Sequence, residues 1–242
     1  MDVTFNLARR YRGALENGQF SGHGGYFCGE VAERVPGLSA LTIRKRIPLE
    51  RGLTIKESSG RITVHDGDDV VGDSEVRDGR IRVTLPAPIS LEEALDAGKR
   101  FAGFSRPEFF ECFVCGCRRE PGDGLRIFTG EVGEPINGEK QLAGVWYPHA
   151  SMLSPDGFVK PELIWAALDC PGGWAIPKEC KTLVLQVDIL APVPGGCPVV
   201  VRGWLQEPVD GSRSSRFAGS ALLDESGNVL ALGGAKWIRD KS

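Results

Sequence analysis

Residues 157–169 read Gly-Phe-Val-Lys-Pro-Glu-Leu-Ile-Trp-Ala-Ala-Leu-Asp, an apolar helix pattern with a carboxylate, Asp169, at its far end. Pro161 stands where the first helical residue is expected, a position that tolerates the missing N–H of proline. A carboxylate on an otherwise apolar helix is costly to bury unless it has a partner or a chemical task. The segment therefore predicts a buried central helix and a candidate functional residue.

A second helix of this kind is predicted in the first half of the chain. The segment 23–25, His-Gly-Gly, opens a helical pattern over residues 24–35, which the Pro-Gly pair at 36–37 ends. The helix in the second half is predicted over residues 161–170, because the Pro-Gly-Gly of 171–173 is expected to end or kink it.

Antiparallel strands are expected after each helix. Short β-branched or alternating runs separated by Gly or Asp turns are typical of a meander. The predicted strands are 41–47, 53–56, 61–65 and 69–76 in the first half and 183–190, 199–205, 216–223 and 229–238 in the second, with hairpin turns at 210–211 and 226–228. Each half is thus one helix followed by a meander, which indicates an internal repeat.

The segment between the halves has a different character. Residues 89–100 predict a short surface helix, in which Ser90 and Glu93 form a capping box. Two further strands, 125–128 and 141–146, are expected to belong to the second sheet. We therefore divide the chain into an N-terminal domain (1–88), a linker with a short helix (89–108) and a C-terminal domain (109–242).

Composition excludes several classes of partner. The chain has 242 residues, of which 41% are hydrophobic and 25% charged, enough for one large domain or two small ones. A formal net charge of −3 argues against nucleic-acid binding. No run approaches the roughly 18 apolar residues of a membrane span, and the first residues lack the pattern of a signal peptide. We therefore expect a cytoplasmic protein with no nucleic-acid or membrane partner.

The seven cysteines favour reduced thiols over a disulfide framework, because their number is odd and several lie in apolar runs. The pattern Cys-x2-Cys-x-Cys at 112–117 is compatible with zinc, but a structural zinc site needs four ligands. No second pair stands at short spacing, since His149 is isolated and Cys170, Cys180 and Cys197 are scattered. We therefore predict no metal. Serine hydrolase, phosphate-loop and dinucleotide-binding motifs are absent from the sequence.

One long helix beside an antiparallel sheet, occurring twice in one chain, resembles the double hotdog arrangement of acyl-CoA thioesterases of the thioesterase II kind. Single-hotdog thioesterases of the phenylacetic-acid-pathway kind carry Cys-Phe-x-Cys-Gly, then a Gly-Leu strand, then Gly-hydrophobic-hydrophobic-His-Gly-Gly with an acid nine residues after the His. The matching segments here are 112–116, 124–128, 157–159 and 168–169. The resemblance implies an α+β double hotdog, in which two long helices, each wrapped by an antiparallel sheet, form a pseudo-dimer within one chain.

The two halves depart from the family pattern in opposite ways. In the second half, the His-Gly-Gly of the family is replaced by Lys-Pro-Glu at 160–162, and proline offers no N–H. In the first half, residues 22–27 match the helix opening, but Ala32 occupies the ninth position after His23. Glu33 comes one residue later, about 100° further around the helix. Each half therefore keeps what the other has lost.

The resemblance implies that the two helices lie antiparallel, so that Gly24, Gly25 and Asp169 form one composite site. N–H groups at the helix start would bind the thioester carbonyl and favour its developing negative charge. Asp169 would act as a general base on water or attack the carbonyl directly. His23 is expected at the same carbonyl-binding turn, holding its geometry rather than acting as the base, and Thr182 is expected to position water.

The expected function is thus hydrolysis of small-molecule acyl-CoA thioesters, or of acyl-carrier-protein thioesters, with no cofactor beyond the CoA of the substrate. The alternative is a non-catalytic hotdog module that binds acyl-CoA or a lipid-like ligand. The Lys-Pro-Glu replacement favours it, as does Gly234, which stands near the place of a family Gln. Acyl length and the association of double-hotdog units into homo-oligomers are left open.

Overall fold

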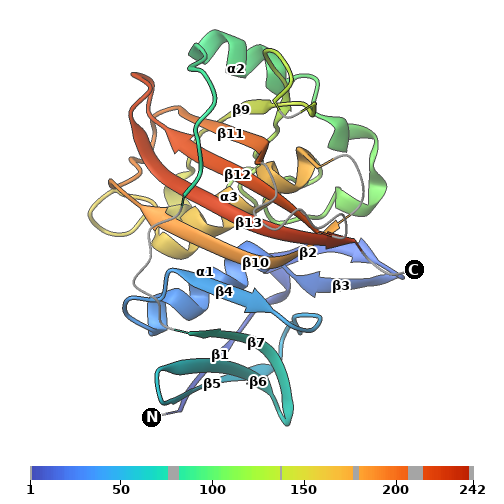
Figure 1. Cartoon of the computed structure of the whole chain (residues 1–242), viewed down its shortest axis with the longest axis vertical. Coiled ribbons are helices and arrows are strands. Elements are labelled where there is room, and N and C mark those ends of the chain that lie inside the picture. Colours follow the sequence, from blue (N-terminus) through green and yellow to red (C-terminus); the bar gives the residue numbers. More distant parts are fainter. Residues whose placement is uncertain (1, 76–81, 137, 177–179, 207–214, 240–242) are drawn as a thin grey trace.

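The computed structural model describes residues 2–75, 82–136, 138–176, 180–206 and 215–239. Two helices, α1 (Gly24–Arg34) and α3 (Pro161–Trp174), pack against each other along one face of a large antiparallel sheet (Figure 1). Both had been expected from the apolar periodicity of the sequence. Within the described residues, no helix combines the length and the apolar character needed to cross a membrane.

In the described part of the chain, eleven strands form the main sheet, in the order β1-β5-β6-β7-β4-β10-β13-β12-β11-β9-β8. Their bounds are β1 (Val3–Asn6), β4 (Ala40–Ile43), β5 (Gly52–Ser58), β6 (Arg61–Asp66), β7 (Asp69–Glu75), β8 (Gly130–Glu131), β9 (Leu142–Trp146), β10 (Cys180–Ile189), β11 (Val199–Gln206), β12 (Ser215–Leu223) and β13 (Val229–Arg239). A separate hairpin consists of β2 (Arg12–Glu16) and β3 (Gln19–Gly22). The remaining helical segments are α2 (Leu91–Gly98), η1 (Arg9–Tyr11), η2 (Ala102–Ser105), η3 (Pro107–Phe109) and η4 (Ala150–Met152).

The two predicted meanders are joined into one sheet by antiparallel pairing of β4 with β10. Leu41 is paired with Leu185, and Thr42 with Val184. An edge strand of each meander would otherwise expose unpaired backbone groups, and pairing the two edges satisfies both. The joint places the start of α1 next to β10 of the second half.

Most predicted strands are confirmed with shifted ends, and the capping box is present, since the Glu93 N–H donates to Ser90 Oγ at 3.2 Å. The predicted strand 125–128 is wrong. Its residues belong to no ladder, because the Leu125 and Ile127 N–H groups donate to the carbonyls of Phe113 and Val114 instead. The predicted turn at 210–211 and the last residue of the predicted strand 69–76 lie outside the described residues.

The predicted end of the second helix near residue 170 is also wrong, because α3 continues through Pro171 to Trp174. The proline removes one helical hydrogen bond. The last turn is nevertheless held against the sheet, where Gly172 faces Ala218 and Gly173 faces Trp237. Burial of that turn offsets the lost hydrogen bond.

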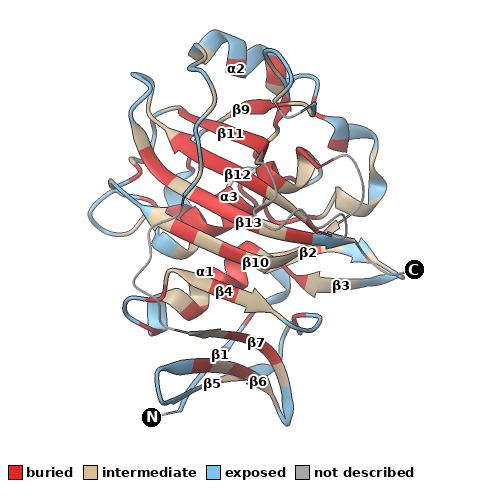
Figure 2. Cartoon of the chain, viewed as in Figure 1, coloured by how far each residue is buried: buried red, intermediate tan, exposed pale blue. Residues whose placement is uncertain are grey.

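Two glycines allow the backbones of α1 and α3 to approach each other closely. A Cβ added to Gly25 would lie 2.7 Å from both Asp169 Cβ and the Trp165 carbonyl oxygen, and one added to Gly29 would lie 2.6 Å from Glu162 Cα. Because the later glycine meets the earlier residue of α3, the helices are antiparallel. Figure 2 shows buried residues along both helices and the strands that cover them.

We predict that Gly29→Ala lowers the free energy of unfolding by about 1–3 kcal/mol, although alanine is the better helix former. The added methyl group would overlap the α3 backbone. Chemical denaturation followed by circular dichroism measures the change. Glu33→Ala, at an exposed position of the same helix, is the matched control and should stay within about 0.5 kcal/mol of the unchanged chain. Equal stability of the two variants would contradict the close helix contact.

Candidate active site

Asp169 lies where α3 faces the start of α1, and its side chain is buried, with 4% of the residue exposed. Its Oδ2 accepts a hydrogen bond from the Gly25 N–H at 2.7 Å, and its Oδ1 accepts one from the Thr182 hydroxyl at 2.8 Å. Gly25 comes from α1, Asp169 from α3 and Thr182 from β10. The structure therefore brings together residues that the sequence placed in two different halves of the chain.

His23 is the N-cap of α1 and lies beside the same carboxylate. The Tyr26 N–H donates to His23 Nδ1 at 3.3 Å, which satisfies one of the open amides of the first turn. His23 Nδ1 is 3.8 Å from Asp169 Oδ2. The histidine thus holds the turn in the way expected of an N-cap and adds a positive or polar neighbour to the acid.

The charge balance of the site is set by burial and by these few partners. Desolvation is the main reason why the pKa of Asp169 is raised above its usual value, although His23, Thr182 and the Gly25 amide act in the opposite direction. A carboxylate with a raised pKa is a stronger base than a solvated one. The site therefore holds a buried carboxyl group that takes up a proton more readily than a solvated one.

The Gly24 N–H is the free donor of this turn. Among the residues that the structure describes, it makes no hydrogen bond, whereas the next two amides donate to Asp169 and His23. A Cβ on Gly24 would lie 3.1 Å from Asp169 Oδ2 and 3.1 Å from Ile43 Cδ1. Gly24, Ile43 and Thr182 are half-buried, so the Gly24 amide and the carboxylate share the side of the site that is closer to solvent.

The opposite ends of the same two helices form no comparable site. The first residue of α3 is Pro161, which has no N–H, and the next is Glu162, whose pKa is raised by burial and by the charges of Glu30 and Glu33. Glu33 is exposed on α1. At the start of α1, an amide N–H meets the carboxylate of Asp169. At the start of α3, several acids lie near one another, and the first helical residue has no N–H to offer.

Sequence reasoning missed a group of thiols behind His23. His23 Nε2 is 3.2 Å from Cys170 Sγ, and Cys170 Sγ is 3.8 Å from Cys112 Sγ. The ligand atoms of these three residues all lie within 4.8 Å of one another. Hydrogen bonds from the thiols of Cys115 and Cys170 lower the pKa of Cys112. The Cys-x2-Cys spacing indicated Cys112 and Cys115, but no local sequence pattern related them to Cys170 or His23.

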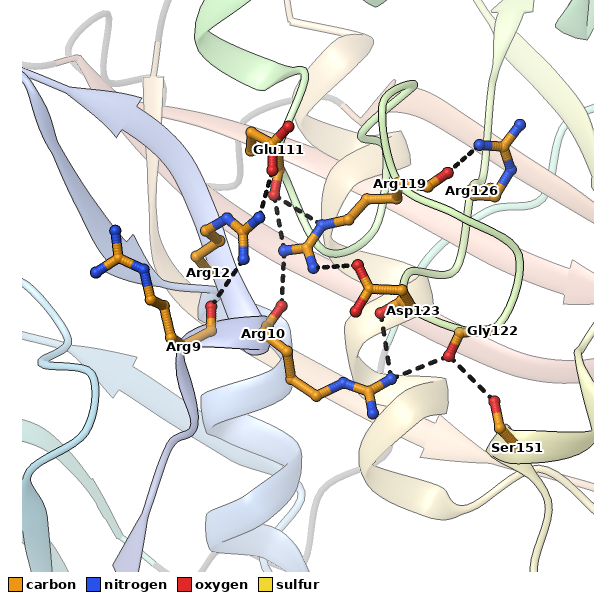
Figure 3. A network of polar contacts seen from close by, with 9 residues as sticks. All are labelled: Arg9, Arg10, Arg12, Glu111, Arg119, Gly122, Asp123, Arg126 and Ser151. Carbon is orange, nitrogen blue, oxygen red and sulfur yellow. Dashed lines mark hydrogen bonds and ion pairs between the residues drawn. The ribbon is translucent and has the colours of Figure 1, made fainter.

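The segment that carries Cys112 and Cys115 is fastened to the start of the chain by a buried guanidinium. Arg119, only 2% exposed, donates to the Arg10 carbonyl at 2.7 Å, to the Glu111 carbonyl at 2.8 and 3.0 Å, and to Asp123 Oδ2 at 2.8 Å. Figure 3 shows these bonds together with the Arg12–Glu111 ion pair. The thiol-bearing loop is thus set in place by contacts that do not involve the thiols.

No protein-family model and no curated protein matches this sequence. Solved structures do match along nearly the whole chain. A protein described as a putative thioesterase from Novosphingobium aromaticivorans DSM 12444 is 15% identical, with a TM-score of 0.61, over 98% of this chain and 94% of that one. A putative thioesterase II from Thermobifida fusca YX is 13% identical, with a TM-score of 0.59, over 100% and 94%. The tesB protein of Mycobacterium avium subs paratuberculosis is 10% identical, with a TM-score of 0.56, over 98% and 92%.

At these identities the likeness establishes the fold. The chain shares the hotdog fold of these solved structures, which is the fold that the segments around residues 112–128 and 157–169 indicate. The residues at the site are argued from their own geometry.

We predict that Thr182→Val lowers the free energy of unfolding by about 1–3 kcal/mol, because it leaves a buried carboxylate oxygen without its donor. Valine keeps the shape of threonine and favours a strand. Thr4→Val, at an exposed strand position, is the control and should change stability by less than about 0.5 kcal/mol. Denaturant titration of both variants tests this, and a Thr182→Val variant as stable as Thr4→Val would show that the hydroxyl does not support Asp169.

Proposed function

We propose that this chain is a double hotdog, divided at residues 1–88, 89–108 and 109–242, and that it hydrolyses acyl-CoA or acyl-carrier-protein thioesters at one composite site. The observation that carries the proposal is the 2.7 Å hydrogen bond between the Gly25 N–H of α1 and Asp169 Oδ2 of α3. It places an acid from one half beside the open helix start of the other. The thioesterase descriptions of the structural neighbours support the same class of reaction.

The thioester carbonyl oxygen would bind the Gly24 N–H, with His23 and Gly25 completing the turn. Gly24 has the free amide and stands next to Asp169 Oδ2. The positive end of α1 favours the negative charge that develops on the oxygen during attack. In this assignment the Gly25 amide holds the carboxylate, and Gly24 polarises the substrate.

Asp169 is the catalytic residue, and two routes are open to it. As a general base it removes a proton from water while the water oxygen attacks the carbonyl carbon, and the CoA thiolate leaves. As a nucleophile it attacks the carbonyl carbon, the C–S bond breaks and the thiolate leaves, and water then hydrolyses the resulting mixed anhydride. Thr182 holds Oδ1 at 2.8 Å and so directs Oδ2 toward the helix start. Single turnover in isotopically labelled water separates the routes, because only the anhydride route carries the label into Asp169.

A non-catalytic module that binds an acyl-CoA or lipid-like ligand is the second candidate. The observation in its favour is that Asp169 is buried and already uses both oxygens in hydrogen bonds. Tight binding of acyl-CoA without any release of CoA, in the unchanged chain, would establish this function instead.

We predict that the chain releases free CoA from members of a panel of short-, medium- and long-chain acyl-CoAs, measured by chromatography. Asp169→Asn, which keeps the shape of the side chain, should reduce kcat at least about 100-fold, as expected on loss of a general base or nucleophile. Asp169→Ala should do the same. Chromatography is preferred because the seven cysteines would react with thiol dyes.

The matched control is Glu33→Ala, the carboxylate of the opposite helix face, which should leave kcat/KM nearly unchanged. Equal loss in the Asp169 and Glu33 variants would refute the assignment of the site. Release of CoA by the Asp169 variants at the rate of the unchanged chain would refute it as well.

A further inference from the structure

Four side chains with metal-binding atoms converge behind the proposed active site, and the proposed hydrolysis uses only one of them. They come from three separate elements: His23 from the start of α1, Cys112 and Cys115 from the loop after η3, and Cys170 from α3. The two loop cysteines are buried, and Cys170 is half-buried. The ligand atoms of His23, Cys112 and Cys170 all lie within 4.8 Å of one another, and Cys115 follows Cys112 by three residues in the same turn.

The spacing of three of these atoms, those of His23, Cys112 and Cys170, fits a tetrahedral metal site. Zinc binds thiolate sulfur at about 2.3 Å and imidazole nitrogen at about 2.0–2.1 Å, so tetrahedral ligands stand about 3.8 Å apart for two sulfurs and about 3.6 Å for nitrogen and sulfur. The observed separations are 3.8 Å between the sulfurs of Cys112 and Cys170, and 3.2 Å between His23 Nε2 and Cys170 Sγ. A zinc ion between these three would need only small shifts of their side chains, and Cys115 would turn toward it to complete the tetrahedron.

We propose that His23, Cys112, Cys115 and Cys170 bind one zinc ion in a closed Cys3His site. Thiolate and imidazole are the ligands that select zinc over hard cations such as magnesium. Four protein ligands leave no open position, which is typical of a structural site rather than a catalytic one. This inference goes beyond the proposed thioesterase function and does not depend on it.

Neighbouring groups lie against two of the proposed ligands, Cys115 and His23. The Trp174 indole N–H donates to Cys115 Sγ at 3.5 Å. When Nε2 binds the metal, the ring proton lies on Nδ1, which then no longer accepts the Tyr26 N–H. Metal binding would thus exchange that cap bond for an approach of Nδ1–H to Asp169 Oδ2, which is 3.8 Å away. Metal-binding histidines commonly donate this second N–H to a carboxylate. Gly116 keeps the Cys-x2-Cys turn tight, since a Cβ there would lie 2.4 Å from the Cys112 carbonyl oxygen.

The metal would join the loop to both central helices on the buried side of Asp169. Gly24 and Thr182, on the other side of the carboxylate, are half-buried and stay available to a substrate. The zinc would thus fix the direction of His23 and of the segment that follows it without occupying the place of the thioester.

The test is the metal content of the full chain, purified under reducing conditions without chelator and measured by mass spectrometry of the elements. We expect about one zinc ion per chain in the unchanged protein and less than about a tenth of that in Cys112→Ser and Cys170→Ser. Cys28→Ser, a buried thiol outside the group, and Cys197→Ser, an exposed one, are the controls and should keep the full complement.

A second measurement uses the unchanged chain and so does not depend on the folding of the variants. The reduced, metal-free protein is titrated with Co²⁺, and a site of three thiolates should give the intense absorption of tetrahedral cobalt together with thiolate-to-metal charge transfer. Zinc should then displace the cobalt at a ratio of about one per chain. Chelation of the bound metal should lower the Tm.

The proposal is overturned if neither the purified nor the reconstituted reduced chain holds a stoichiometric metal. It is also overturned if zinc is retained by both Cys112→Ser and Cys170→Ser. A Cys112–Cys170 disulfide in the peptide map, with no metal uptake after reduction, would replace the metal site by a thiol pair. None of these outcomes alters the prediction for CoA release by the unchanged chain, so the two proposals fail separately.

Discussion

The close antiparallel contact between α1 and α3 is the constraint on which the rest of the molecule depends. Within one helix, a first-turn amide and a carboxylate eight residues later are about 12 Å apart along the axis and cannot act on the same atom. Two antiparallel helices remove that separation, provided that their backbones can touch. Gly25 and Gly29 provide this contact. The pairing of β4 with β10 then brings Thr182 to the far side of Asp169.

The same contact explains why the molecule is asymmetric. Antiparallel helices create two ends, each with a helix start from one half and a possible acid from the other. One end has open amides and a buried carboxylate with hydrogen-bond donors. The other has a proline at the first helical position and a group of acids, Glu30, Glu33 and Glu162. A buried carboxylate is stable only where donors satisfy it, so the composite site that we propose is assigned to the first end.

Behind this site the polar groups are held by one loop. The segment after η3 crosses from the β2–β3 hairpin to α3, and Arg119 fastens it through main-chain oxygens of Arg10 and Glu111. A buried guanidinium is costly unless its donors find acceptors, and for Arg119 they come from this loop and from the start of the chain. The loop in turn presents Cys112 and Cys115 to His23 and Cys170. The start of α1 therefore contacts Asp169 through Gly25 and the cysteine cluster through His23.

The sequence by itself determined the parts of this protein that depend on near neighbours. Apolar periodicity predicted both helices, alternation and turns predicted most strands of both meanders, and the spacing of Ser90 and Glu93 predicted the cap that is observed. The likeness of short segments to a known family pointed to Asp169, Gly24 and Gly25.

Local rules failed at Pro171 and at 125–128, where packing against the sheet and hydrogen bonds to the loop outweighed propensity. Only the tertiary structure decided that the two meanders form one sheet and that His23 meets Cys170, 147 residues later. Such contacts depend on which backbones can approach each other, and no local pattern encodes that.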